Sequence, residues 1–409
     1  MNQEQLLGAR KPRTAIEIIL LVLSVFYLFW KTPIVAYYMN TYVAMSLLVA
    51  MLAFFLLQDR ACRKTPPVLL MVTFLYAIFD AYNLLLNKTS ILNILWTVFL
   101  AVMPVFVGVI IVANKMDYLV RVLVPVIILL YAITAATTYI GLLQFPDASR
   151  IMAADSTAYI KYFPRNIGSF NFIYSLTLLH PLIICVLKEK KHLILSFAFT
   201  IISAMAVFKS DYTTAALLFL ISCIAYFFPS RTSNNRVRAW GLLLSLAIVV
   251  LIFFVPTILD GLAEVSFLYD SSDKLRDVAN ILRGGNASDV ATKARIRVYE
   301  RSWNTFLEYP FWGATVKNAN SVGGHSFFLD ILAKWGILGF SLVGVLYFFF
   351  RRLHRRICGG ATVSYYAFLF MCMIVIICIL NPHAWLFELG FAAPVFLQYA
   401  TTAAESPTK

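Results

Sequence analysis

Long runs of apolar residues, separated by short polar stretches, dominate the chain. A run of about 20 apolar residues is long enough to cross the hydrocarbon core of a bilayer as a helix. About twelve such runs occur, at residues 15–30, 36–57, 67–86, 91–113, 119–143, 167–187, 193–208, 212–229, 239–258, 326–350, 362–381 and 384–400. The pattern predicts an all-α polytopic membrane protein in which the first run is a retained transmembrane helix.

The composition agrees with a membrane protein. Of the 409 residues, 61% are hydrophobic and 13% are charged, and the mean hydropathy is +0.80. The net charge of +14 is high enough for a nucleic-acid binder, but the basic residues lie at the ends of the apolar runs instead of forming one patch. We therefore expect no nucleic-acid partner. The six cysteines show neither a CxxC motif nor Cys/His metal spacing, so we expect no disulfide framework or zinc site.

Lysine and arginine counts predict the orientation. When both termini are placed in the cytoplasm, every short inner loop is basic, as the positive-inside rule requires. The boundaries that follow are a cytoplasmic N-terminus at 1–14, nine spans in 15–258, one large periplasmic loop at 259–325, three spans in 326–400 and a cytoplasmic tail at 401–409. The most basic inner segment lies after the tenth run and contains Arg351, Arg352, Arg355 and Arg356.

The large outer loop contains a predicted helix, "SDVATKARIRVYERSWNTFLEYP". Ser288 is a suitable N-cap and Pro310 ends the helix. Two interpretations remain open. The helix either lies on the membrane surface over the spans or is an ordinary amphipathic loop helix.

The faces of this predicted helix differ in chemistry. Arg297 and Arg301 lie one turn apart on one face. Another face has a partial apolar stripe, formed by Val298, Trp303 and Phe306.

Charged residues inside an apolar run need a partner or a function, because their insertion costs about 2.5–3.5 kcal/mol. Asp330 and Lys334 stand four residues apart in the tenth run, so we expect them to pair within one helix. Lys334 is alternatively available to an anionic ligand. Gly336 and Gly339 are expected to let another span approach closely.

His325 stands at the predicted outer end of the same run, after the flexible "NSVGG". An imidazole there either caps the helix or accepts a proton from a hydroxyl nucleophile. His383 is the other histidine on this side. Three cations from separate segments of the same side, Arg165, Lys209 and Arg295, are suited to hold a pyrophosphate.

The residues resemble a known family at this point. An Arg lies fifteen residues before a Pro and a Gly-containing turn, and a His and a small polar residue precede two spaced glycines. The matching positions are Arg295, Tyr299, Pro310, Gly313, His325, Ser326, Gly336 and Gly339, and upstream Arg165, Gly168, Phe170 and Asn171. This pattern is similar to the shared C-terminal membrane domain of bacterial O-antigen ligases and O-antigen or capsule polymerases. Lys209 stands where family ligases have an Arg.

The resemblance implies a GT-C-like membrane glycosyltransferase of the bacterial inner membrane, with its active site facing the periplasm. The implied donor is a polyprenyl-diphosphate-linked glycan. The implied acceptor is a lipid A core sugar for a ligase, or another carrier-linked repeat unit for a polymerase. His325 would be the base and Arg165, Lys209 and Arg295 the diphosphate ligands, with Arg297, Arg301, Asp330, Lys334 and His383 as secondary candidates.

No cofactor or metal is expected, since the outer loops lack a DxD motif. A transporter or flippase is the main alternative from another class, and a membrane scaffold is a further one. A transporter is expected to have charged residues deep in several spans or two inverted halves. This chain has a single large loop, so its halves differ.

Overall fold

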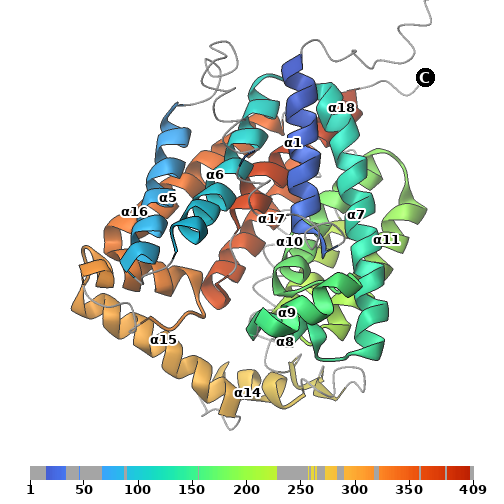
Figure 1. Cartoon of the computed structure of the whole chain (residues 1–409). Coiled ribbons are helices and arrows are strands. Elements are labelled where there is room, and N and C mark those ends of the chain that lie inside the picture. The colour runs from blue at the N-terminus through green and yellow to red at the C-terminus, as the bar shows by residue number, and fades with distance from the viewer. Residues whose placement is uncertain are drawn as a thin grey trace, which may run out of the picture.

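The fold is a bundle of helices in a computed structural model (Figure 1). The structure describes residues 15–33, 46, 67–86, 90–154, 156–227, 257, 259–261, 263–264, 272–282, 290–316, 322–358, 361–382 and 385–405. In these ranges every regular element is a helix.

Long helices occupy the predicted apolar runs. The exceptions are 36–57 and 239–258, which lie outside the described residues apart from Ser46 and Thr257. The helices run up and down the bundle in Figure 1. They are α1 (Ala15–Lys31), α5 (Pro67–Leu86), α6 (Ile91–Ala113), α7 (Asp117–Gln144), α10 (Phe170–Glu189), α11 (Leu193–Lys209), α12 (Thr213–Ser222) with the 3-10 turn η3 (Cys223–Phe227), α16 (Phe327–Ile357), α17 (Ala361–Leu380), the π-helical turn η7 (Glu388–Ala392) and α18 (Ala393–Glu405).

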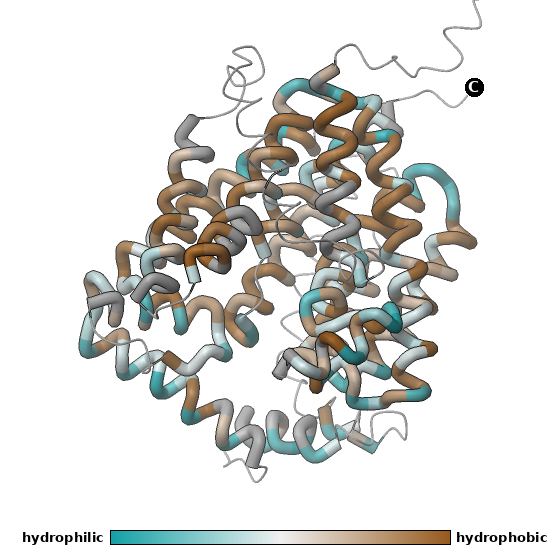
Figure 2. The backbone as a smooth tube through the Cα atoms, in the orientation of Figure 1, coloured by the Kyte–Doolittle hydropathy of each residue, from teal (hydrophilic) through white to brown (hydrophobic). Residues whose placement is uncertain are grey.

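Four of the described helices are long and apolar enough to cross a membrane. They cover Asp117–Gln144, Phe170–Glu189, Phe327–Ile357 and Val363–Leu380. Shorter apolar helices cover Val102–Ala113, Leu193–Lys209 and Thr213–Tyr226. Figure 2 shows the hydrophobic residues along the upright helices and the hydrophilic ones at the lower end. The chain is therefore a helical polytopic membrane protein.

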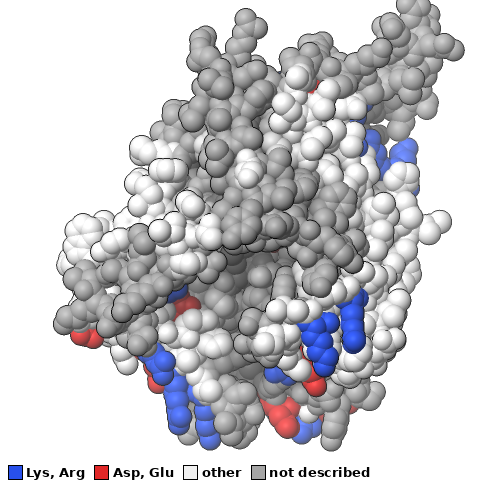
Figure 3. Space-filling view, viewed as in Figure 1, with Lys and Arg blue, Asp and Glu red and all other residues white. Residues whose placement is uncertain are grey.

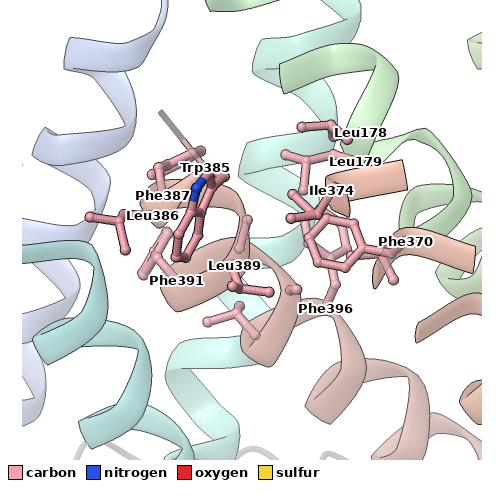
Figure 4. Packing of buried hydrophobic residues seen from close by; sticks show 14 of the residues in the cluster. Leu178, Leu179, Phe370, Ile374, Trp385, Leu386, Phe387, Leu389, Phe391 and Phe396 are labelled. Atoms are coloured by element: carbon pink, nitrogen blue, oxygen red, sulfur yellow. The ribbon is translucent and has the colours of Figure 1, made fainter. Parts of the chain in front are cut away.

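Helix α10 forms the centre of the bundle. It packs against α11, α12, α17 and α18, and all its residues from Phe172 onward are buried. Figure 4 shows Leu178 and Leu179 facing Phe370 and Ile374 of α17, with Phe396 of α18 close by. Apolar side chains that are exposed on the outer helices are expected to face lipid, which is as apolar as the core.

Further helices lie at the lower end of the bundle in Figure 1. Their bounds are Ala148–Ala154 (α8), Ser156–Tyr162 (α9), Phe163–Arg165 (η2), Ser272–Leu282 (α14), Val290–Glu308 (α15) and Gly313–Val316 (η5). The predicted loop helix corresponds to α15, although its proposed cap Ser288 lies outside the described residues. The pattern of apolar runs missed α8, α9 and α14, because helices this short and polar give no such run.

Two glycines lock the turn after α15 against α16. Gly313 and Gly336 both have left-handed backbone, with φ of 66° and 63°. A Cβ on Gly336 would lie 2.4 Å from the backbone of Phe311, and one on Gly313 would lie 2.3 Å from the backbone of Lys334. The Ile337 amide donates to the Pro310 carbonyl at 2.8 Å. The backbone of each segment thus occupies the space that a side chain at the other segment's glycine would need.

Gly336 also divides α16, because its backbone is not helical. Residues 337–357 alone would span about 31 Å, which matches the hydrocarbon thickness of a bilayer. The prediction that Gly336 and Gly339 admit another span is wrong. A turn lies against Gly336, and the atoms nearest to a Cβ at Gly339 belong to Trp335 of the same helix.

We expect Gly336→Ala to lower the free energy of unfolding by about 2–4 kcal/mol, because it combines left-handed strain with a backbone clash. Gly344→Ala on the same helix is the matched control, since a Cβ there meets nothing within 4 Å. Thermal unfolding of both variants in detergent tests this. Equal melting temperatures for the two variants would show that the backbone contact at Gly336 does not stabilise the fold.

Candidate functional site

The loop that carries His325 is anchored by the side chain of Asp330. The Oδ1 atom of Asp330 accepts hydrogen bonds from Ser302 Oγ at 2.7 Å and from the Gly324 amide at 3.1 Å. Its Oδ2 atom accepts from the Ser326 amide at 3.2 Å. Asp330 is only 5% exposed, whereas His325 is exposed. The imidazole is thus presented to the outside by a loop with a buried anchor.

Helix α15 holds the other side of this loop. The Gly323 amide donates to Ser302 Oγ at 2.9 Å. A Cβ at Gly323 would lie only 2.0 Å from the Val298 carbonyl oxygen, so the two backbones are in direct contact. Ser302 therefore accepts from the loop and donates to Asp330, and so joins α15, the loop and α16.

The start of α16 is further fixed against α17. The Phe327 amide donates to the Asn381 carbonyl at 3.1 Å, and the Tyr299 hydroxyl donates to the Leu380 carbonyl at 3.0 Å. Ser326 caps α16, because its Oγ accepts from the Leu329 amide at 3.3 Å. The alternative in which His325 itself caps the helix is therefore wrong, because the next residue has that role.

The predicted ion pair between Asp330 and Lys334 does not form among the described residues. The Asp330 carboxylate lies in the first turn of α16 and is bonded to a hydroxyl and two backbone amides. Hydrogen bonds to a carboxylate at a helix N-terminus are favoured by both charge and the helix dipole. Lys334 is half-buried, and its backbone packs against Gly313.

The buried face of α15 is polar. Ser302 and Thr305 are 1% and 5% exposed, while Trp303 is 45% exposed. The predicted apolar stripe is divided, since Val298 and Phe306 are only half-buried. This helix turns small hydroxyl side chains toward the bundle and its indole away from it. Its predicted arginines, Arg297 and Arg301, are both exposed.

Arg165 lies in a second anchored loop. Its guanidinium carbon is 4.4 Å from the ring centroid of Phe145 and 6.0 Å from that of Tyr162, and the side chain is exposed. The backbone beyond it is fixed by two threonines of α7. Thr137 Oγ1 donates to the Asn166 carbonyl at 2.9 Å, and the Gly168 amide donates to Thr138 Oγ1 at 2.8 Å.

Lys209 ends α11 beside this loop. Ser149 of α8 joins the two segments, because its Oγ donates to the Gly168 carbonyl and its own carbonyl accepts from the Tyr212 hydroxyl, both at 2.8 Å. The Tyr212 hydroxyl is the donor in the second of these bonds. An ion pair between Arg150 and Asp211 adds a second link.

No pattern in the sequence pointed to these linking residues. Ser149 and Tyr212 are ordinary loop residues in the sequence, and each acquires its role only through partners 19 and 63 residues away along the chain.

The predicted site residues therefore lie in two groups at one end of the bundle. One group contains Arg165 and Lys209, and the other contains His325 with α15. Figure 1 shows α8 and α9 on one side of this end and α15 on the other, and Figure 3 shows Lys and Arg side chains on both sides. Arg295 belongs to α15, but its side chain lies outside the described residues, as does His383.

Charged and hydrogen-bonding groups define this end. Among the residues that the structure describes, no group of three or more His, Cys, Asp or Glu side chains is placed to hold a metal ion. Exposed cations and an exposed imidazole at the same end of the bundle are suited to bind a phosphorylated substrate and to accept a proton.

Bundle and site together define a polytopic membrane protein with an anchored polar site at one end. Residues 197–344 match a family model described as O-antigen ligase. This segment contains Lys209, α15, Gly313, His325 and Gly336, whereas Arg165 lies outside it. This match supports the resemblance to the O-antigen ligase and polymerase family, whose members are membrane glycosyl-transfer enzymes. No curated protein matches the chain at a significant level.

The Ser302 to Asp330 link is expected to stabilise the His325 loop. Ser302→Ala and Asp330→Asn should each cost about 1–3 kcal/mol of unfolding free energy, because each leaves a buried group without a partner. The double variant should cost less than the sum. Hydrogen exchange of the Gly323 and Gly324 amides should rise in both single variants.

Ser341→Ala is the control for these variants. Its hydroxyl donates only along α16, to the Ile337 carbonyl, so its loss should leave the loop amides protected. Strict additivity of the two single variants would contradict the link.

Proposed function

We propose that this protein is an O-antigen ligase. In this proposal it transfers a polysaccharide from a polyprenyl diphosphate carrier to a sugar hydroxyl of lipid A core, on the periplasmic face of the inner membrane. The reaction is metal-independent and inverts the anomeric carbon. The observation that carries the proposal is the exposed His325 on a loop with a buried anchor, within the segment that matches the O-antigen ligase family.

His325 is the proposed general base. A base must be reachable by the acceptor yet held in one place, and the loop meets both demands. Asp330 and Ser302 restrict the backbone on either side of the imidazole, while the ring itself is exposed. Positioning of this kind lowers the entropic cost of bringing base and hydroxyl together.

Cations are proposed to stabilise the leaving group. The acceptor oxygen forms a bond to the anomeric carbon, the bond from that carbon to the diphosphate oxygen breaks, and His325 takes the hydroxyl proton. Negative charge grows on the diphosphate during this step, so Arg165, Lys209 and Arg295 accelerate it by binding the charge more tightly in the transition state.

The remaining candidates have subordinate roles in the proposal. Arg297 and Arg301, exposed on α15, are available to the glycan or to lipid phosphates. Lys334 and His383 stay secondary candidates. The arrangement in two groups suggests that the donor diphosphate binds near Arg165 and Lys209 and bridges toward α15. The link through Ser149 between the Arg165 loop and the turn after Lys209 supports a shared diphosphate site for these two cations.

We expect His325→Gln to reduce transfer by about 100-fold or more, as is typical for loss of a general base. The assay uses purified protein in detergent, with carrier-linked glycan and lipid A core. Since detergent leaves no compartments, product formation also distinguishes an enzyme from a transporter or flippase. His192→Gln is the control, because His192 is exposed at the start of α11, at the opposite end of that helix from Lys209.

Full activity of His325→Gln would remove the base from the proposal. Wild-type activity that persists in the presence of a chelator is expected, and its loss would overturn metal independence. Absence of any product with wild type would favour the transporter.

A polymerase that joins carrier-linked repeat units is the alternative within the family. The segment at 146–166, which forms α8, α9 and η2, favours it, because polymerases often use two outer loops. The full His motif and the single large loop favour the ligase.

Lipopolysaccharide banding in a deletion strain separates the two. A ligase deletion should leave core without any attached O-antigen. Core that carries a single repeat unit would instead identify a polymerase. Complementation with wild-type protein but not with His325→Gln should restore the full ladder in either case, which links the phenotype to this site.

A further inference from the structure

A cavity lies between α16 and α17, at the opposite end of α16 from His325. Its volume is about 230 Å³. Arg351, His354 and Arg355 line it from the last turns of α16. Ala367, Phe368 and Met371 line it from α17. Neither the proposed reaction nor the family match, which ends at residue 344, accounts for it.

The two walls of the cavity differ in chemistry. Arg351 and Arg355 stand four residues apart, so they lie one above the other on one face of α16, and both are exposed. Ala367 and Met371 are buried and apolar, and Phe368 is 54% exposed. The cavity therefore joins a pair of guanidinium groups to an apolar wall that opens outward at Phe368.

Its depth in the bilayer matches a headgroup. Residues 337–357 cross about 31 Å, so Arg351 and Arg355 lie in the last turns of the span, where hydrocarbon gives way to headgroups. Lysine and arginine counts predict that this end is cytoplasmic. Basic pockets between transmembrane helices on that side are suited to anionic lipid headgroups.

We propose that this cavity binds one anionic phospholipid. The phosphate is held by Arg351 and Arg355, and an acyl chain runs along Phe368 and Met371. A guanidinium pair suits the phosphate oxygens because its planar groups donate in parallel. The apolar wall selects a lipid over a free phosphate.

A simpler explanation makes a different prediction. Basic residues at this end satisfy the positive-inside rule and the negative end of the helix dipole, and for those purposes all four arginines of the segment are equivalent. The cavity distinguishes them. Arg351 and Arg355 line it, whereas Arg352 and Arg356, exposed on the same turns, are not among its lining residues.

Native mass spectrometry of the purified full chain tests the site, with phosphatidylglycerol titrated against phosphatidylcholine. Wild type should retain one phosphatidylglycerol in preference to phosphatidylcholine. Arg351→Gln/Arg355→Gln should bind it about tenfold or more weakly, on the basis of about 1 kcal/mol per basic residue near an anionic surface. Arg352→Gln/Arg356→Gln carries the same charge change and should bind it like wild type.

Two further measurements distinguish binding of a lipid from binding of a free phosphate, and a third checks that the variants are folded. Ala367→Phe fills the apolar wall without a charge change and should also weaken phosphatidylglycerol binding. Glycerol phosphate should compete poorly, since it lacks acyl chains. Equal losses in both arginine pairs, no loss in either, or full competition by glycerol phosphate would each overturn the proposal. Melting temperatures near wild type confirm that the variants are folded.

Discussion

The contact between the turn after α15 and the break in α16 holds the site together. Gly313 and Gly336 each adopt a backbone conformation that L side chains rarely adopt, and each makes room for the other segment's main chain. Without that contact α15 would have little to hold it against the bundle, because its buried face consists of hydroxyl side chains instead of large apolar ones. The hydrogen bonds of Ser302 and Asp330 are too few to dock a helix alone, but they fix its register once the glycines have brought it close.

The same arrangement explains why an aspartate is tolerated at the start of an apolar helix. Asp330 is nearly inaccessible, and its two oxygens receive three hydrogen bonds from groups that would otherwise lack acceptors. A buried carboxylate with partners of this kind specifies one loop conformation, whereas an apolar side chain there would leave the Gly324 and Ser326 amides unpaired. The polar residues near His325 thus fix the conformation of the loop and do not serve mainly to balance charge.

The helices of the bundle were largely predictable from the sequence, and the anchors of the site were not. Apolar runs fix where a span lies to within a few residues, as α5 at Pro67–Leu86 and α6 at Ile91–Ala113 illustrate, because a bilayer leaves the backbone no alternative to a helix. A proline that ends the helix and a suitable N-cap residue also located α15. By contrast, spacing alone favoured an ion pair of Asp330 with Lys334, since a helical wheel contains no information about the preceding loop or about Ser302.

Arg165 and Lys209 were chosen for their charge, and their common anchor at Ser149 depends on long-range contacts that no local pattern encodes. The arginines beside the α16 cavity were assigned only to topology, because a cavity exists only between packed helices.

The outward-facing aromatic residues around α15 set the height of the site. Trp303 is 45% exposed, and in the turn that follows Phe311 and Trp312 are 67% and 62% exposed. Tryptophan rings settle at the level of lipid headgroups. In the proposed function, the diphosphate of a membrane-embedded polyprenol carrier would lie at that level too. The headgroup layer of the bilayer would therefore set the depth of both α15 and the proposed carrier. The loop that carries His325 is fixed to α15 and α16, so a change in bilayer thickness would move His325 and the proposed donor together.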